Sequence, residues 1–288
     1  MKIAVTGASG HLGRLAVQDL LETQPAGNII ALVRDAAKAA DLAARGVQVR
    51  VAAYDDFPAV KAALAGVDKL LLVSSSEIGQ RFPQHKNLID AAKAAGVQHV
   101  VYTSAPHATT STLILASEHK ATEEYLAGSG LSFTIARNNW YTENYLQTVE
   151  TARHTGAIVA AAGQGRVASA SRADYAAGVV AVLLGTGHEG KVYEFTGDHA
   201  WDFNELAGAI AGIIGRPVTY QPVDAPTLIK ILMGVGLDEG TAGFVAALDG
   251  NIAAGMLAET TGDLSALLGR PTTPLQDGLR AALMAKPG

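Results

Sequence analysis

The chain has 288 residues, which is long enough for one large domain or for a domain with a smaller partner. Hydrophobic residues make up 49% of it and charged residues 17%, as in ordinary globular enzymes with a buried core. The net charge of -5 and the lack of basic runs argue against a nucleic-acid partner. The sequence contains no cysteine, which excludes disulfides, thiolate metal sites and a cysteine nucleophile.

Neither a membrane partner nor a metal is expected. No apolar run approaches the ~20 residues that a membrane helix needs, and the N-terminus lacks the pattern of a signal peptide. The histidines show no metal-ligand spacing. These features favour a cytoplasmic protein.

Strand-like and helix-like segments alternate through the first half of the chain. Short apolar runs predict strands at 3–5, 29–33, 47–52, 69–73, 99–102 and 133–136. Helices are predicted at 12–21, 36–45 and 58–65, in a segment ending at Gly96, and at 118–127. Almost wholly apolar strands are typical of a parallel sheet covered by helices on both faces. The expected fold class is α/β, a doubly wound parallel Rossmann sheet with a smaller helix-rich C-terminal region.

The alternation loosens after about residue 140. Short strand-like pieces at 157–161, 192–195 and 218–220 mix with helical patterns near 172–184, at 204–214 and over 225–285. We therefore expect a dinucleotide-binding Rossmann domain over 1–150. The remainder, 151–288, is expected to form mainly a substrate or cap region, with some segments returning to the Rossmann domain.

Three glycines, Gly7, Gly10 and Gly13, follow the first predicted strand and open the first predicted helix. Glycine permits a sharp turn and a close approach to a pyrophosphate, and the helix N-terminus offers free N–H groups to that anion. A tight turn without a ligand is the alternative. The position as the first strand-to-helix turn of a parallel sheet favours a bound dinucleotide.

The end of the second predicted strand indicates which dinucleotide binds. NAD enzymes usually have an acidic residue there for the adenosine ribose, whereas this chain has Arg34. A guanidinium suits a 2′-phosphate, so the sequence favours NADP. The alternative is a solvated arginine, with Asp35 as the ribose ligand.

A catalytic motif is missing further along the chain. Short-chain dehydrogenases that reduce ketones carry a serine followed by Tyr-x-x-x-Lys; here Ser104 ends the fifth strand, but Ala116 stands four residues before Lys120. The alkoxide made from a ketone needs a positioned acid, whereas a hydroquinone anion is delocalised and can take its proton from water. The absence favours acceptors that are already good electrophiles, such as quinones and cationic dyes, or no catalysis.

Three longer runs carry a resemblance to a known group. "SSSEIGQRFPQHKNLIDAAKAAGVQHVVYTS", "ARNNWYTENYL" and "GRVASASRADYAAG" are similar to the NmrA-like branch of the atypical short-chain dehydrogenases/reductases. Within it the chain most resembles the bacterial NAD(P)H:quinone oxidoreductases of type 2, followed by the triphenylmethane-dye reductases. The resemblance extends along almost the whole chain. Asn139 departs from the pattern, which has glycine at that position.

The resemblance implies roles for residues at the ends of several strands. The NADP-binding residues would be Gly7, Ala8, Ser9, Gly10, His11 and Leu12 around the pyrophosphate, Arg34 on the 2′-phosphate, Ser74, Ser75 and Ser76 on ribose and phosphate oxygens, and Asn138, Asn139, Trp140, Tyr141, Thr142 and Glu143 beside the nicotinamide. Gln80, Arg81 and Trp140 are expected in the acceptor pocket, and Tyr141 and Asn138 are the candidate catalytic residues. The alternatives are a serine loop that bonds its own backbone, a solvated loop at 80–83 and simple aromatic packing. His119 and Lys120 have no assigned role.

The function that the resemblance implies is NADPH-dependent two-electron reduction of a small-molecule quinone by direct hydride transfer. The alternatives are a redox-sensing regulator of the NmrA type that binds NADP(H) without catalysis, and a reductase of triphenylmethane-type dyes. A homodimer is left open. A sugar-nucleotide epimerase is disfavoured, because that chemistry needs the missing tyrosine.

Overall fold

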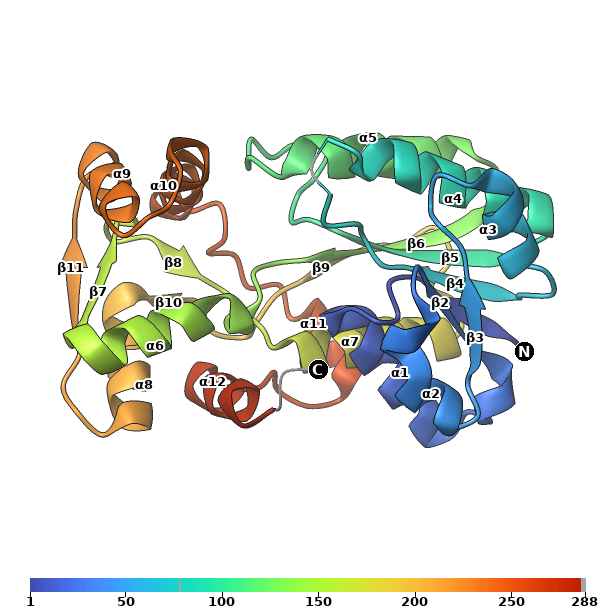
Figure 1. Ribbon diagram of the computed structural model, residues 1–288, viewed down its shortest axis with the longest axis horizontal. Helices are drawn as coiled ribbons and strands as arrows, with labels where there is room; N and C mark the ends of the chain where they lie inside the picture. The colour runs from blue at the N-terminus through green and yellow to red at the C-terminus, as the bar shows by residue number, and fades with distance from the viewer. Residues whose placement is uncertain (78, 286–288) are drawn as a thin grey trace.

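The computed structural model describes residues 1–77 and 79–285. Its main feature is a seven-stranded sheet in the order β3-β2-β1-β4-β5-β6-β9 (Figure 1), and every neighbouring pair in it is parallel. The strands are β1 (Ile3–Val5), β2 (Ile29–Val33), β3 (Gln48–Val51), β4 (Lys69–Leu72), β5 (His99–Ser104), β6 (Ser132–Asn138) and β9 (Val192–Phe195). The strand order turns back between β1 and β4, as in doubly wound sheets. The predicted fold class is confirmed.

Helices cover both faces of this sheet. Figure 1 shows α1 (His11–Thr23), α2 (Ala40–Ala44), α7 (Arg172–Leu184) and α11 (Asp263–Leu268) on one side, and α3 (Phe57–Ala63), α4 (Arg81–Ala95) and α5 (Ala116–Gly128) on the other. Every residue of β1, β2 and β5 is buried, because each strand has helices above and below it. The apolar runs of the sequence therefore became central strands.

Short 3-10 turns occur beside these elements. They are η1 (Ala26–Asn28), η2 (Ala36–Ala39) and η3 (Thr142–Tyr145). The helix predicted at 36–45 is shorter than expected, because its first turn is η2 and only α2 is α-helical. The Asp35 side chain accepts a hydrogen bond from the Ala37 N–H and so caps the N-terminus of η2.

The rest of the chain forms a second group of elements beyond one end of the sheet (Figure 1). It contains α6 (Leu146–Thr155), β7 (Ala157–Ala160), β8 (Arg166–Val167), β10 (Trp201–Asp202), α8 (Phe203–Ile214), β11 (Thr219–Pro222), α9 (Ala225–Gly234), α10 (Glu239–Ala253) and α12 (Leu275–Met284). β7 pairs with β11 in parallel, and β8 pairs with β10 in antiparallel. Trp201 and Phe203 belong to an apolar core that this second group forms together with Leu113 and Ala116. None of the helices in the described ranges is both long and apolar enough to cross a bilayer.

Candidate active site

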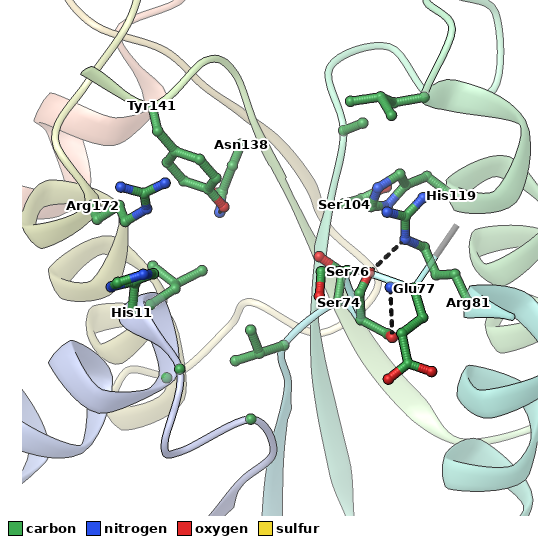
Figure 2. Close-up of a pocket in the computed structure, with 18 of the residues that line it drawn as sticks. His11, Ser74, Ser76, Glu77, Arg81, Ser104, His119, Asn138, Tyr141 and Arg172 are labelled. Atoms are coloured by element: carbon green, nitrogen blue, oxygen red, sulfur yellow. Dashed lines mark hydrogen bonds between the residues drawn. The ribbon is translucent and has the colours of Figure 1, made fainter. Parts of the chain in front are cut away.

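The ends of six parallel strands meet at one cavity of about 520 Å³, a volume in the range of cofactor and ligand sites. Residues that end or follow β1, β2, β3, β4, β5 and β6 line it, so it lies at the carboxyl edge where open α/β sheets bind their ligands. Figure 2 shows His11, Asn138, Tyr141 and Arg172 on one wall, and Ser104, His119 and Arg81 on the facing wall. The cavity therefore has polar and charged side chains on both of its walls.

The glycine loop forms the base of the first wall. A Cβ at Gly13 would lie 2.4 Å from the Gly7 carbonyl oxygen, and Gly7 has a φ of 58°, so this tight turn requires glycine at both positions. Gly10 precedes α1 without a side-chain cap, and the first turn of the helix has no acidic residue. The free N–H groups and the positive end of the helix dipole therefore face the cavity, as an anion site requires.

Arg34 extends from the end of β2 into the cavity lining. Its side chain is 66% exposed and forms an ion pair with Glu77, which follows β4. Asp35, the alternative ribose ligand, is outside the lining and caps η2 instead. Arg34, rather than Asp35, is thus the charged side chain of this strand end that lines the cavity.

The three serines after β4 all line the cavity, and part of their hydrogen-bonding capacity is already used. The Ser74 N–H donates to Thr103 Oγ1 at 2.9 Å, and the Ser75 N–H donates to His85 Nε2 at 2.9 Å. The Ser75 hydroxyl donates to Gln84 Oε1 at 2.6 Å. These bonds hold the loop in place beside the glycine turn.

Asn138 is the buried polar residue at the end of β6. It is 4% exposed, and its Oδ1 has no hydrogen-bond partner within the described residues. Its Nδ2 donates to the Tyr141 hydroxyl at 3.4 Å, and the Arg172 guanidinium lies 4.8 Å from the centre of the Tyr141 ring. Burial raises the pKa of Tyr141, so this phenol stays protonated. Asn138 and Tyr141 therefore offer one unpaired acceptor and one hydroxyl at the cavity.

The neighbours of Tyr141 divide into two groups. Asn139 and Trp140 line the cavity, whereas Thr142 and Glu143 lie outside its lining. The Thr142 hydroxyl bonds to Ser169 Oγ at 2.9 Å, and a Glu143 oxygen accepts from the Arg172 N–H at 2.8 Å. Thr142 and Glu143 thus hold η3 against the start of α7.

Arg81 is the charged residue of the facing wall. Its side chain is 8% exposed; Nε donates to the Ser75 carbonyl at 2.7 Å, and Nη1 pairs with Glu118 Oε2 at 3.1 Å. Gln80, its predicted companion, is exposed and outside the lining, as is buried Ala8 of the glycine loop. Lys120 also lies outside the lining, with Glu124 at 3.9 Å.

Three hydrogen bonds of the site were not predicted. The Gly7 N–H donates to the Tyr54 hydroxyl at 2.5 Å, so a side chain following β3 reaches the glycine turn. The Ser104 hydroxyl donates to Glu123 Oε1 at 2.5 Å, and Tyr102 bonds to His119 at 2.8 Å. The sequence could have indicated Tyr54 and Ser104 by one feature: each lies at or just after the carboxyl end of a predicted strand.

The residues present fit a dinucleotide phosphate. A Cβ at Gly13 would fill the space inside the glycine turn, and the first turn of α1 has no acidic residue. Arg34 supplies a cation at the end of the neighbouring strand. The unpaired Asn138 Oδ1 matches the N–H₂ of a carboxamide such as that of nicotinamide.

Comparisons with known proteins agree with this geometry. The model of the NAD(P)H-binding family matches residues 7–185. Quinone oxidoreductase 2 of Escherichia coli is 49% identical over 277 residues, covering 96% of this chain and 97% of that protein. NAD(P)H azoreductase of Xenophilus azovorans is 32% identical, with 83% of each chain covered.

Solved structures give the same result. The E. coli NADPH-dependent quinone oxidoreductase complexed with NADPH has a TM-score of 0.94 at 48% identity, covering 98% of this chain and 99% of that one. The Citrobacter sp. triphenylmethane reductase complexed with NADP(H) has a TM-score of 0.93 at 37% identity, covering 98% and 100%. The chain belongs to the NAD(P)H-binding family and, within it, to the reductases of the quinone oxidoreductase 2 type.

Proposed function

We propose that this protein catalyses the NADPH-dependent two-electron reduction of quinones by direct hydride transfer. The observation that carries the proposal is the 49% identity to E. coli quinone oxidoreductase 2 along 96% of the chain. The cavity supports it, because an anion-binding turn, a cation for a 2′-phosphate and an apolar and aromatic wall share one space.

The residues that would hold NADPH follow from the site. The turn from Gly7 to Leu12 would bind the pyrophosphate, Arg34 the 2′-phosphate, and Ser74 to Ser76 the ribose and phosphate oxygens. Asn138 would accept a hydrogen bond from the carboxamide. Bound in this way, NADPH supplies the hydride.

The protein's own contribution is orientation and exclusion of water. Trp140 and Tyr141 provide flat aromatic surface for a quinone ring, and Leu113 and Leu115 add apolar lining. Such placement of two reactants is a large part of the rate gain of a bimolecular reaction. Tyr141, which burial keeps protonated, can donate a hydrogen bond to an acceptor oxygen, and water can supply the final proton.

Cationic triphenylmethane dyes are a second candidate acceptor. The observation that favours them is the 37% identity and TM-score of 0.93 to the triphenylmethane reductase. Hydride addition to such a cation gives a neutral product, which needs no acid.

The domain boundary at residue 150, the homodimer and the cytoplasmic location stay predictions from the sequence.

The test is oxidation of NADPH, followed by its absorbance, with a panel of small quinones and one triphenylmethane dye. NADH and an acceptor-free reaction serve as controls. We expect rapid oxidation with quinone and NADPH, and slower oxidation with NADH. Tight NADPH binding without oxidation by any acceptor would instead indicate the redox-sensing regulator.

A further inference from the structure

We propose that His119 is a further catalytic residue for quinone reduction, and that Tyr102 is its positioning residue. His119 Nε2–H donates a hydrogen bond to the quinone oxygen on which negative charge develops, and Tyr102 holds the imidazole in the tautomer that carries this proton. The inference rests on the proposed quinone reduction, and it adds to Tyr141 a second donor, on the facing wall of the cavity (Figure 2).

His119 lies in the first turn of α5 and lines the cavity (Figure 2). The residue is only 6% exposed, and its Nδ1 lies 2.8 Å from the hydroxyl of Tyr102, a fully buried residue of β5. Nε2 is on the opposite edge of the ring from this contact. Across residues 1–77 and 79–285, no hydrogen bond to Nε2 is found, and Nε2 is not among the buried unpaired atoms. It is therefore accessible to a ligand in the cavity.

The hydrogen bond determines which nitrogen of His119 carries the proton. Burial raises the pKa of Tyr102, so its phenol is protonated and needs an acceptor. The hydroxyls of Thr122 and Ser104 also interact with this phenol and lower its pKa, but both hydroxyls already donate elsewhere, to the Glu118 carbonyl and to Glu123. Among the described residues, the hydrogen bond of the phenol is the one to His119 Nδ1, so we assign the phenol as its donor and Nδ1 as the unprotonated nitrogen.

The charge state of His119 follows from its surroundings. Burial, together with the nearby Arg81 cation, lowers the pKa of His119 to about 3, so the ring is neutral at physiological pH. A neutral imidazole has one N–H, and Nδ1 already accepts a hydrogen bond. The proton is on Nε2, the nitrogen that is left for the cavity.

Three polar groups near His119, those of His85, Thr122 and Ser104, have their protons directed elsewhere. The Ser75 N–H donates to His85 Nε2, so His85 carries its proton on Nδ1 and donates it to the Thr122 hydroxyl at 3.0 Å. The Thr122 hydroxyl donates in turn to the Glu118 carbonyl at 2.8 Å. Ser104, at the strand end where short-chain reductases place a catalytic serine, donates to Glu123. His119 is thus a neutral donor of this wall whose proton is not already engaged.

The reaction needs such a donor at one moment. Addition of a hydride transfers two electrons and one proton to the quinone, oxidises the nicotinamide and leaves a hydroquinone anion. A hydrogen bond from Nε2–H becomes stronger as the oxygen becomes negative, so it lowers the barrier more than it favours substrate binding. Neutral histidine is known to act in this way in other enzymes. The proton stays on Nε2, and water then protonates the oxygen.

The kinetic test compares variants of His119 and Tyr102. For His119→Leu we expect kcat with quinones to fall by ~100-fold, the lower end of the loss found on removal of one oxyanion donor, with the KM for NADPH unchanged. The loss should be greatest for alkylated quinones, whose hydroquinone anions are most basic, and smallest for halogenated quinones. His119→Gln restores an N–H and should recover part of the rate. Tyr102→Phe should lower kcat several-fold, because without the Tyr102 hydroxyl His119 is no longer held in the tautomer with its proton on Nε2.

A second tyrosine–histidine pair provides the matched control. The Tyr193 hydroxyl lies 2.8 Å from His188 Nδ1, and neither residue lines the cavity. Tyr193→Phe and His188→Leu remove the same contact elsewhere and should leave kcat and its dependence on the quinone unchanged. Thermal unfolding of each variant shows whether it folds; if His119→Leu does not, His119→Gln and Tyr102→Phe carry the comparison.

Nuclear magnetic resonance of ¹⁵N-labelled histidines tests the tautomer without any turnover. We expect His119 to be protonated on Nε2 in the wild type and to be a mixture of tautomers in Tyr102→Phe. A proton on Nδ1, or a loss of kcat that is equal for all quinones, would overturn the inference while leaving quinone reduction intact. If the wild type fails to oxidise NADPH with every quinone tested, the proposed function is overturned instead.

Discussion

Arg34 and Glu77 form an ion pair at the cavity, so the cation that faces the predicted 2′-phosphate site already holds a carboxylate. A second Glu77 oxygen accepts a hydrogen bond from Gln84 at 2.7 Å, and this bond, with the Arg34 contact, lowers the pKa of Glu77. Glu77 is therefore ionised at neutral pH. Binding of a 2′-phosphate at Arg34 is then an exchange of one anion for another, which links cofactor choice to the loop after β4.

Arg34→Ala should weaken NADPH binding by ~10- to 100-fold and leave NADH binding almost unchanged. A charge-assisted hydrogen bond to phosphate contributes about 1.5–3 kcal/mol, and only NADPH carries the phosphate. Fluorescence titration with each nucleotide measures the two affinities. An equal loss for NADPH and NADH would place the 2′-phosphate elsewhere.

Glu77→Gln should have the opposite effect. The substitution removes the competing charge, so NADPH binding should become up to about five-fold tighter, in line with the value of an exposed ion pair. NADH binding should not change. Glu150→Gln, which breaks the exposed Arg153 pair on α6, is the matched control. Weaker NADPH binding in Glu77→Gln would show that Glu77 supports the site rather than competing for it.

Gly13→Ala should destabilise the protein by about 1–3 kcal/mol, because the new Cβ would lie 2.4 Å from the Gly7 carbonyl oxygen. Gly208→Ala is the control on α8, where no atom lies within 4 Å of the added Cβ. That variant should be stabilised by up to about 1 kcal/mol, since alanine favours a helix over glycine. Denaturant unfolding of both variants checks the contrast; similar stabilities would mean that the glycine turn can relax.

The sheet and the glycine turn could be predicted because local patterns encode them. The strand predicted at 29–33 is β2, with the same bounds; Gly7 and Gly10 lie between β1 and α1, and Gly13 lies in the first turn of α1, as expected. The helix predicted at 36–45 was wrong in its first turn, where the Asp35 side chain bonds the backbone. Hydrophobic periodicity cannot show such a side-chain contact.

The polar contacts of the site could not be predicted, because they depend on how distant elements pack. Tyr102 and His119 meet only because α5 packs beside β5, and Glu77 reaches Arg34 across 43 positions of sequence. The sequence also did not indicate that Thr142 and Glu143 would bond to Ser169 and Arg172.

Asn138→Leu should separate stability from binding. The buried, unpaired Oδ1 costs the cofactor-free protein about 1–3 kcal/mol, so an apolar residue of similar volume should raise its Tm. NADPH binding should weaken by about ten-fold, because the carboxamide loses its acceptor. A fragment of NADP that lacks the nicotinamide should bind equally well to both proteins. Unchanged NADPH binding would show that Asn138 does not contact the carboxamide.

The stability of the protein should fall as the pH is lowered from about 6.5. His85 and His119 have their pKa values lowered from 6.5 to about 3 by burial and by Arg81. Above pH 6.5 neither state binds these protons; below it the unfolded chain takes them up and the native protein does not. Each histidine should therefore remove about 1.4 kcal/mol of stability per pH unit until the pH nears 3.

Variants isolate this contribution from that of the carboxylates, which titrate mainly below about pH 4.5. In His119→Gln the unfolded chain takes up one proton fewer, because only His85 of the pair remains. The slope of the unfolding free energy against pH, between about pH 6 and 5, should therefore be shallower by about 1.4 kcal/mol per pH unit. His154→Gln replaces an exposed histidine and should keep the wild-type slope. Denaturant unfolding at a series of pH values gives these slopes. A slope for His119→Gln equal to that of the wild type would mean that His119 takes up its proton in the native protein as readily as in the unfolded chain.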